Sequence, residues 1–393
     1  MASRPRYLWI GIVLVLSIAA ACTIAAFSGS AEAGRSQTPL FSDSGSAGTT
    51  ASPASQPAGM PIGLDYGDTL FDAGSAKLSA SLADASAIGA SWIRVDLPWD
   101  GIQPSWSSTT YNWSKYDALV AAADARGLRM LVTVVDPPVW ARAKACKAQE
   151  ACEPANPEAY AAFAALAAKR YAPDGVHDWE IWNEENLEGF ATSANPEAAY
   201  ATLLADTYTA IHSADSKALV MLGGLGMVEN EPAKHWIGAY DFLSGVAAAG
   251  GLSFADAIGV HPYDWNDLPQ DGEPFTMIDT GQDSLESVLK SNDHSGIPFW
   301  ITETGAPTSG SGPAAGGPSQ DATHASLQWQ ATLAKDIVAT ETADPRITGL
   351  FWYTDTDLPD SDLYFGLRTA AGAKKPVFAA LTSAIATYRR SLG

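Results

Sequence analysis

The feature that most constrains the fold is a regular alternation of apolar strands with Ala-rich helical stretches, which starts near residue 60. We predict strands at 61–66, 92–97, 129–135, 177–182, 218–222, 257–262, 298–303 and 348–353. The predicted helices lie at 76–88, 115–126, 157–171, 196–213, 232–248, 283–291, 322–341 and 375–391. Strict alternation indicates a parallel sheet. Eight units predict an α/β fold, a closed (β/α)8 TIM barrel rather than an open doubly wound sheet.

Local signals support this interpretation. Proline follows Asn156, Asn195 and Glu231, which places it at the first position of three predicted helices. A dinucleotide-binding fold is disfavoured, because the first strand is followed by a Tyr-Gly-Asp-Thr sequence at 66–69 and not by a G-x-G-x-x-G turn.

The N-terminus has the pattern of a targeting segment. Arg4 and Arg6 precede an uncharged apolar run at 8–27, which predicts a signal peptide or a signal-anchor transmembrane helix over 1–27. Cleavage after 31–33 (Ala-Glu-Ala), retention as an anchor and lipidation of Cys22 all stay open. Each alternative predicts an extracytoplasmic domain, either membrane-anchored or secreted. Residues 28–59, rich in Ser, Ala, Gly and Pro, predict a disordered linker before a barrel domain at 60–393.

The charge balance limits the partners. The chain has 44 acidic and 23 basic residues and a net charge of −21. Nucleic-acid binding depends on basic side chains that neutralise phosphates, so we expect no nucleic-acid partner. Contact with a membrane is expected only through the N-terminal segment. We expect a monomer.

Two cysteines lie in the predicted barrel, Cys146 and Cys152. Outside the cytoplasm, such a pair predicts a disulfide that closes a short loop. Two cysteines without a nearby histidine do not indicate a zinc site, so we expect neither a metal nor a cofactor.

Glutamates end two of the predicted strands. The fourth strand runs into Asn183 and Glu184, and the seventh ends at Glu303. In such barrels the chemistry lies at the C-terminal ends of the strands. Two facing carboxyl groups are what cleavage of a glycosidic bond requires, because one donates a proton and the other attacks or activates water.

The sequence Trp-Glu-Ile-Trp-Asn-Glu at 179–184, together with Glu303, resembles clan A of the glycoside hydrolases. It is most similar to glycoside hydrolase family 39, with family 5 next, over about residues 60–390. One departure is Glu185, where these families usually have proline. The resemblance implies a retaining mechanism, with Glu184 as acid/base, Glu303 as nucleophile and carboxyl groups about 5–5.5 Å apart.

The resemblance also implies roles for other residues. Arg94 would orient the nucleophile, Asn183 would bind the sugar 2-hydroxyl, and His261 and Tyr263 would line the site. Trp352 would form the floor of the −1 subsite, with a cis bond after it. Asp96 shares a strand face with Arg94 and joins the candidates. Further candidates are tryptophans in or just after strand ends, where sugars stack: Trp99, Trp106, Trp140, Trp182 and Trp265.

Two other acids are interpreted more simply. Glu180 is expected to be a buried partner of an arginine such as Arg94, and Glu185 a loop acid or a subsite contact.

We therefore predict a glycosidase acting on a polysaccharide, endo-acting on envelope or extracellular glycan. The alternatives are an envelope transglycosylase and a non-catalytic carbohydrate-binding barrel. The acidic character suits a neutral or cationic glycan better than a polyanionic one.

Overall fold

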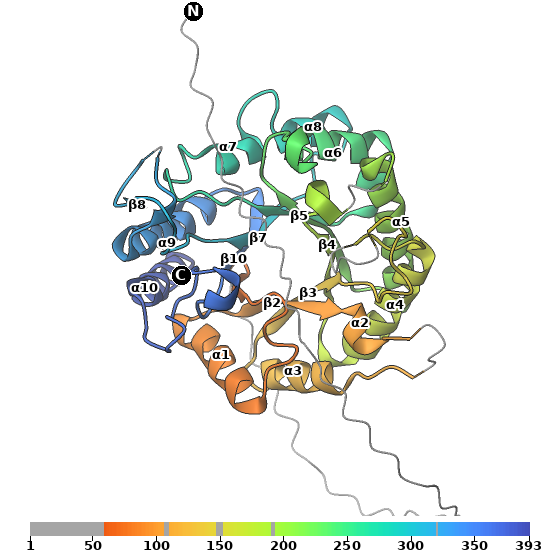
Figure 1. Cartoon of the computed structure of the whole chain (residues 1–393), viewed down its shortest axis with the longest axis horizontal. Helices are drawn as coiled ribbons and strands as arrows, with labels where there is room; N and C mark the ends of the chain where they lie inside the picture. Colours follow the sequence, from red (N-terminus) through yellow and green to blue (C-terminus); the bar gives the residue numbers. More distant parts are fainter. Residues whose placement is uncertain (1–58, 106–109, 147–151, 190–192, 320) are drawn as a thin grey trace, which may run out of the picture.

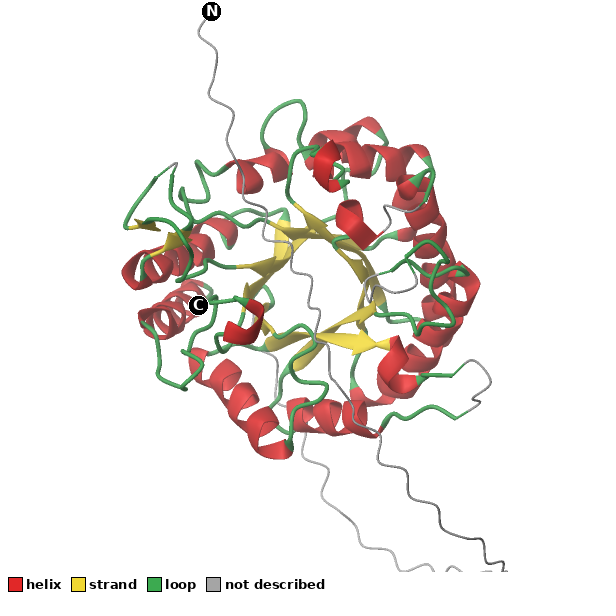
Figure 2. Ribbon diagram, in the orientation of Figure 1, coloured by secondary structure: helices red, strands yellow, loops and turns green. Residues whose placement is uncertain are grey.

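The computed structural model describes residues 59–105, 110–146, 152–189, 193–319 and 321–393. In this part of the chain, eight parallel strands close into a barrel in the order β1-β10-β7-β6-β5-β4-β3-β2, and helices surround it (Figures 1 and 2). The strands are β1 (Ile62–Asp65), β2 (Trp92–Pro98), β3 (Arg129–Val135), β4 (Asp178–Asn183), β5 (Leu219–Gly226), β6 (Ala257–His261), β7 (Phe299–Thr304) and β10 (Ile347–Tyr353). The predicted (β/α)8 TIM barrel is confirmed.

In the outer ring, one main helix belongs to each strand. These are α1 (Ser75–Ile88), α3 (Ser114–Asp124), α4 (Pro157–Tyr171), α5 (Pro196–Ala214), α6 (Ala239–Ala248), α8 (Leu285–Ser291), α9 (Leu327–Glu341) and α10 (Pro376–Ser391). The remaining helical elements are α2 (Trp99–Ile102), α7 (Glu273–Asp279), η1 (Ala172–Asp174), η2 (Glu185–Gly189), η3 (Pro232–Lys234), η4 (Gly251–Phe254) and η5 (Pro359–Ser361). A separate small sheet pairs β8 (Ala314–Ala315) with β9 (His324–Ala325).

Two predicted helices begin later than expected. Pro232 starts only the three-residue η3, because His235 takes a left-handed φ of 58° that ends it, and α6 begins at Ala239. The helix expected from 322 begins at 327, since β9 occupies the preceding residues and Ser326 caps the helix. The caps at Asn156 and Asn195 are confirmed, because each side chain accepts a hydrogen bond from a backbone N–H of its helix.

The amino-terminal end of the barrel interior is filled with apolar side chains. This apolar plug consists of Trp92, Leu131, Met221, Ala257, Trp300 and Phe351. Trp300 stacks on Phe351 and meets Trp92 edge-on, with ring centroids 6.2 and 5.6 Å apart. A Cβ at Gly349 would lie 2.3 Å from the Trp300 ring, so glycine is needed there to let the ring fit. The plug closes one end of the barrel and leaves polar side chains to the carboxyl end.

Cys146 and Cys152 form a disulfide, as predicted. Within the described residues, no helix has the length and apolar character needed to cross a bilayer. The predicted targeting segment and linker lie outside the described residues.

Candidate active site

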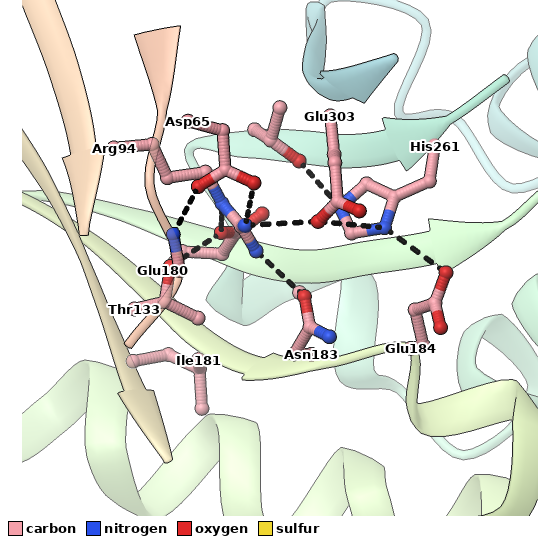
Figure 3. Close-up of polar contacts among 12 residues, drawn as sticks. Asp65, Arg94, Thr133, Glu180, Ile181, Asn183, Glu184, His261 and Glu303 are labelled. Atoms are coloured by element: carbon pink, nitrogen blue, oxygen red, sulfur yellow. Dashed lines mark hydrogen bonds and ion pairs between the residues drawn. The ribbon is translucent and has the colours of Figure 1, made fainter. Parts of the chain in front are cut away.

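Arg94 follows the plug residue Trp92 by two positions on β2. It is the hub of a buried polar network (Figure 3). Its Nε donates to Glu180 Oε2 at 2.6 Å, and its Nη1 donates to Asp65 Oδ2 at 3.0 Å and to Glu303 Oε2 at 3.2 Å. Its Nη2 donates to Asn183 Oδ1 at 2.6 Å. One guanidinium thus joins side chains of β1, β2, β4 and β7.

Strand register explains how this network forms. Arg94 is aligned with Asp65 on β1, and Glu180 is aligned with Thr133 on β3. The Thr133 hydroxyl donates to Glu180 Oε2 at 2.9 Å. A Cβ at Gly259 would lie 2.5 Å from the Glu180 carboxylate, so the absence of a side chain on β6 makes room for it. The prediction that Glu180 is a buried partner of Arg94 is confirmed.

Glu303 is 6% exposed and is held by two donors. Arg94 donates to its Oε2, and the Tyr263 hydroxyl donates to its Oε1. Burial raises the pKa of Glu303 well above its ordinary value, and the charge of Asp65 raises it further, whereas Arg94 lowers it. The two donors therefore offset part of the cost of keeping this carboxylate ionised.

His261 links the two candidate glutamates. Its Nδ1 lies 3.2 Å from Glu184 Oε1 and 3.8 Å from Glu303 Oε2, and its Nε2 lies 3.1 Å from Thr302 Oγ1. Because Glu184 Oε1 and Glu303 Oε2 both lie near this one nitrogen, the distance between them cannot exceed the sum of the first two distances. This limit excludes most of the carboxyl separations of about 6.5–9.5 Å that are typical of inverting enzymes. A Cβ at Gly224 would lie 1.9 Å from His261 Nε2, so glycine is required beside this ring.

The end of β4 departs from regular strand geometry. Trp182 and Glu184 have positive φ angles of 75° and 48°. Trp182 is only 2% exposed and its ring lies 6.0 Å from that of Tyr160 on α4, whereas the Glu184 side chain is 22% exposed near His261. The Glu184 N–H donates to Gly224 O at 3.0 Å, which fixes the turn against β5.

The prediction that Trp352 forms the floor of the site is wrong. Trp352 is 3% exposed and borders a small apolar void together with residues of the helical layer such as Ile337 and Leu381. Strand alternation instead places Phe351 and Tyr353 inside the barrel, Phe351 in the plug and Tyr353 in register with Asp65 near the mouth. The cis bond is also one residue later than expected, between Tyr353 and Thr354.

The prediction of Trp99 as a substrate contact is also wrong. Trp99 is 1% exposed, stacks on Phe163 at 5.3 Å and donates from Nε1 to Gln103 Oε1, so it belongs to the core between barrel and helices. Trp182 and Trp265 are likewise buried, and Trp140 is half-buried with its ring edge-on to that of Trp99. Trp106 lies outside the described residues.

Glu185 is neither a loop acid nor a subsite contact. It is 1% exposed, and its carboxyl group lies beside Gly223, where a Cβ would come within 2.6 Å of Oε2. Nearby, the Tyr200 hydroxyl donates to Ile181 O and accepts from the Gly223 N–H. Burial raises the pKa of Glu185 well above its ordinary value. The side chain therefore lies behind β4, where burial favours its protonated form, in the place where related families carry proline.

Asp96 is brought into the same mouth. It is two residues beyond Arg94 on β2, in register with Thr133, and partly exposed. Burial raises its pKa well above the ordinary value, although the charge of Arg94 lowers it. Sequence reasoning missed Asp65 and Tyr353, which share this region. Asp65 carried a signal similar to that of Glu303, an acid at the carboxyl end of a predicted strand.

A closed (β/α)8 barrel with glutamates at the ends of β4 and β7 defines the clan A retaining glycoside hydrolases, and this chain is a glycosidase of that class. Its sequence matches the family described as Cellulase (glycosyl hydrolase family 5) over residues 56–340, so the chain belongs to that family. No curated protein is similar enough to count as a match.

Similar solved structures belong to three related families. A family 39 glycoside hydrolase from Bacteroides cellulosilyticus WH2 has a TM-score of 0.61 at 20% identity, covering 84% of this chain and 64% of that one. This chain thus spans less than two thirds of that protein. A family 5 structure from Streptomyces cattleya has a TM-score of 0.61 at 17% identity, covering 84% and 80%. Xylanase 10B from Thermotoga maritima has a TM-score of 0.55 at 16% identity, covering 84% and 96%. These likenesses concern the fold.

Proposed function

We propose that the chain hydrolyses the glycosidic bonds of a polysaccharide by double displacement, with Glu303 as nucleophile and Glu184 as acid/base. The observation that carries this assignment is the position of His261 Nδ1 between the two carboxylates, while Arg94 and Tyr263 bind Glu303 and not Glu184. Fixed donors thus favour the ionised form of Glu303. Glu184 is more exposed and lies next to it.

In the first step, Glu303 attacks the anomeric carbon while the bond to the leaving oxygen breaks and Glu184 donates its proton to that oxygen. In the second step, Glu184 takes a proton from water, which attacks the same carbon and releases Glu303. Arg94 and Tyr263 favour the carboxylate of Glu303 before attack and after release, because both donate hydrogen bonds to it.

Asn183 has a role consistent with its geometry. Its Oδ1 accepts from Arg94, which directs the amide so that Nδ2 is available to a sugar hydroxyl next to Glu184. His261 orients the acid/base, since its Nδ1 lies 3.2 Å from Glu184 Oε1. These residues position the two glutamates and the sugar without taking part in bond exchange.

The proposed substrate is an envelope or extracellular glycan, cut internally, and the proposed site of action is outside the cytoplasm. The disulfide between Cys146 and Cys152 supports an oxidising compartment. Envelope transglycosylation would use the same residues and differs only in the acceptor of the second step. A non-catalytic binding barrel would bind glycan without turnover.

The test is a hydrolysis screen with the purified full-length chain. Names of similar structures suggest the first substrates: xylan, cellulose and a Manβ1-4GlcNAc disaccharide. We expect sugar release by the wild type and none by Glu303→Gln. On an aryl glycoside whose leaving group departs without a proton, azide should rescue Glu184→Ala with retained anomeric configuration. Longer products with an added acceptor sugar would indicate transglycosylation. Binding with no turnover on any glycan by a folded wild type would refute the enzymatic proposal.

A further inference from the structure

Two polar side chains in the mouth lack partners in the part of the chain that the structure describes. Tyr353 is 2% exposed, and its hydroxyl has no hydrogen-bond partner there. Asp96 lies on the inner face of β2, and within the same residues its carboxylate takes part in no ion pair or hydrogen bond. A buried hydroxyl without a partner costs free energy unless a ligand binds it, and the half-buried carboxylate is open to a ligand cation.

The two side chains face one region beside Glu303. Tyr353 is aligned with Asp65 on β1, and β1 also pairs with β2, which carries Asp96. The Asp96 N–H donates to Gly67 O at 2.9 Å, and a Cβ at Gly67 would lie 3.7 Å from Asp96 Oδ2. After burial, the charges of Glu303, Asp65, Asp68 and Asp96 raise the pKa of Tyr353, which is consistent with this proximity.

Acidic side chains outnumber cationic ones in this region. Among the described residues, Arg94 is the cation whose charge reaches Asp96, and its hydrogen bonds go to Asp65, Glu180, Asn183 and Glu303. No group of three side chains suited to a metal ion occurs in the described ranges, so a metal site does not account for the acids. An organic cation of a ligand bound beside the nucleophile would pair with Asp96 and favour its ionised form.

We propose that Asp96, Asp65 and Tyr353 form a subsite for an amino sugar, which we call the amino-sugar subsite. The Asp96 carboxylate pairs with the sugar ammonium, and the Tyr353 hydroxyl bonds a neighbouring sugar hydroxyl. This assignment rests on the proposed function, because that function places a sugar ring against Glu303. A uronic acid is disfavoured, since its carboxylate would lie near Asp96, Asp65 and Glu303.

The test measures equilibrium binding of monosaccharides to the full-length wild type by calorimetry, with amine protonated. The probes are glucosamine, galactosamine and mannosamine, their parent hexoses, and glucuronic acid. We expect at least one hexosamine to bind about tenfold or more tightly than its parent, as a charge-assisted hydrogen bond allows. Asp96→Asn removes this preference, and Tyr353→Phe weakens both sugars alike. Asp124→Asn, a matched change of an exposed acid on α3, leaves it intact.

Equal binding of every hexosamine and its parent by the wild type would overturn the proposal. A preference that persists in Asp96→Asn, or in Asp96→Ser if the first variant folds poorly, would overturn it too. The readout needs no turnover, so its failure is separable from that of the proposed function. If glycans are hydrolysed but binding shows no preference for the amine, only the amino-sugar subsite is contradicted. If binding prefers the amine but no glycan is hydrolysed, only the enzymatic mechanism is contradicted.

Discussion

The two ends of the barrel interior are built from the same strands and differ completely in chemistry. On β2, Trp92 belongs to the apolar plug, whereas Arg94, two residues later, is the hub of the polar network. On β10, Phe351 belongs to the plug and Tyr353 to the mouth. On these two strands one inward residue thus supplies stability and the next supplies chemistry, because inward side chains recur every second residue.

Replacing Arg94 should impair both stability and activity, because it removes the cation shared by Asp65, Glu180 and Glu303. We expect Arg94→Met to cost about 3–5 kcal/mol of stability, since it leaves buried carboxylates without a partner. It should also lower kcat/KM by several orders of magnitude. Urea unfolding and steady-state kinetics check both effects. Near wild-type activity in a folded variant would show that Glu303 does not depend on the guanidinium.

Replacing Trp300 should lower the stability of the fold and leave the chemistry of the mouth almost unchanged. We expect Trp300→Ala to destabilise the fold by about 3–5 kcal/mol, because it opens a cavity in the apolar plug. Activity per folded molecule should change little, since the ring lies away from the mouth. Urea unfolding gives the stability, and titration of active sites gives the folded fraction. A large fall in kcat for fully folded protein would contradict this separation.

Glu185 is a buried acid that lies outside both the apolar plug and the polar mouth. The folded chain keeps its proton to a higher pH than the unfolded chain, whose glutamates ionise near pH 4.3. The free energy of unfolding therefore falls as pH rises above that value, up to the folded pKa. We expect Glu185→Gln to remove this loss, with a gain of about 1–3 kcal/mol at neutral pH that shrinks toward pH 4. Urea unfolding across this range, with Asp124→Asn as control, measures it. A gain that does not vary with pH would contradict this account.

The smallest expected effect concerns the acid limb of the pH profile. Glu303 must be ionised to attack, and its pKa is raised, so activity should fall as pH drops through a value above that of an ordinary glutamate. Asp65→Asn removes a charge that raises this pKa, so the limb should move to lower pH. Profiles of kcat/KM for the two proteins check the direction. A shift to higher pH would mean that the loss of the contact between Asp65 and Arg94 outweighs the charge.

The sequence predicted the strands well because each is a compact apolar run between helix-capping signals. It located Glu184 and Glu303 because each comes at the end of such a run. It failed at the last strand, since Leu350, Phe351 and Trp352 are all apolar and give no alternation from which the inward face can be chosen. Trp99 was misplaced for a related reason, because an aromatic residue at a strand end suits a core and a sugar site equally.

Glu185 could not be placed from sequence for a different reason. Strand alternation stops at the end of β4, where Trp182 and Glu184 adopt positive φ angles. Those two angles turn the Trp182 ring toward the helices and decide which of the consecutive glutamates meets the mouth. They depend on backbone contacts with β5, such as the bond from the Glu184 N–H to Gly224 O, which are long-range.

The hydrogen bonds of Arg94 tie enzymatic competence to the completion of folding. Its partners are separated from it by 29, 86, 89 and 209 residues along the chain. Contacts of such long range form only when distant segments meet, and this is slow relative to local helix formation. A nascent chain that has not yet brought β2 and β7 into one closed barrel has no anchored nucleophile, because Arg94 of β2 binds Glu303 of β7. Catalytic power is therefore acquired at ring closure, and partly assembled barrels are expected to be inert.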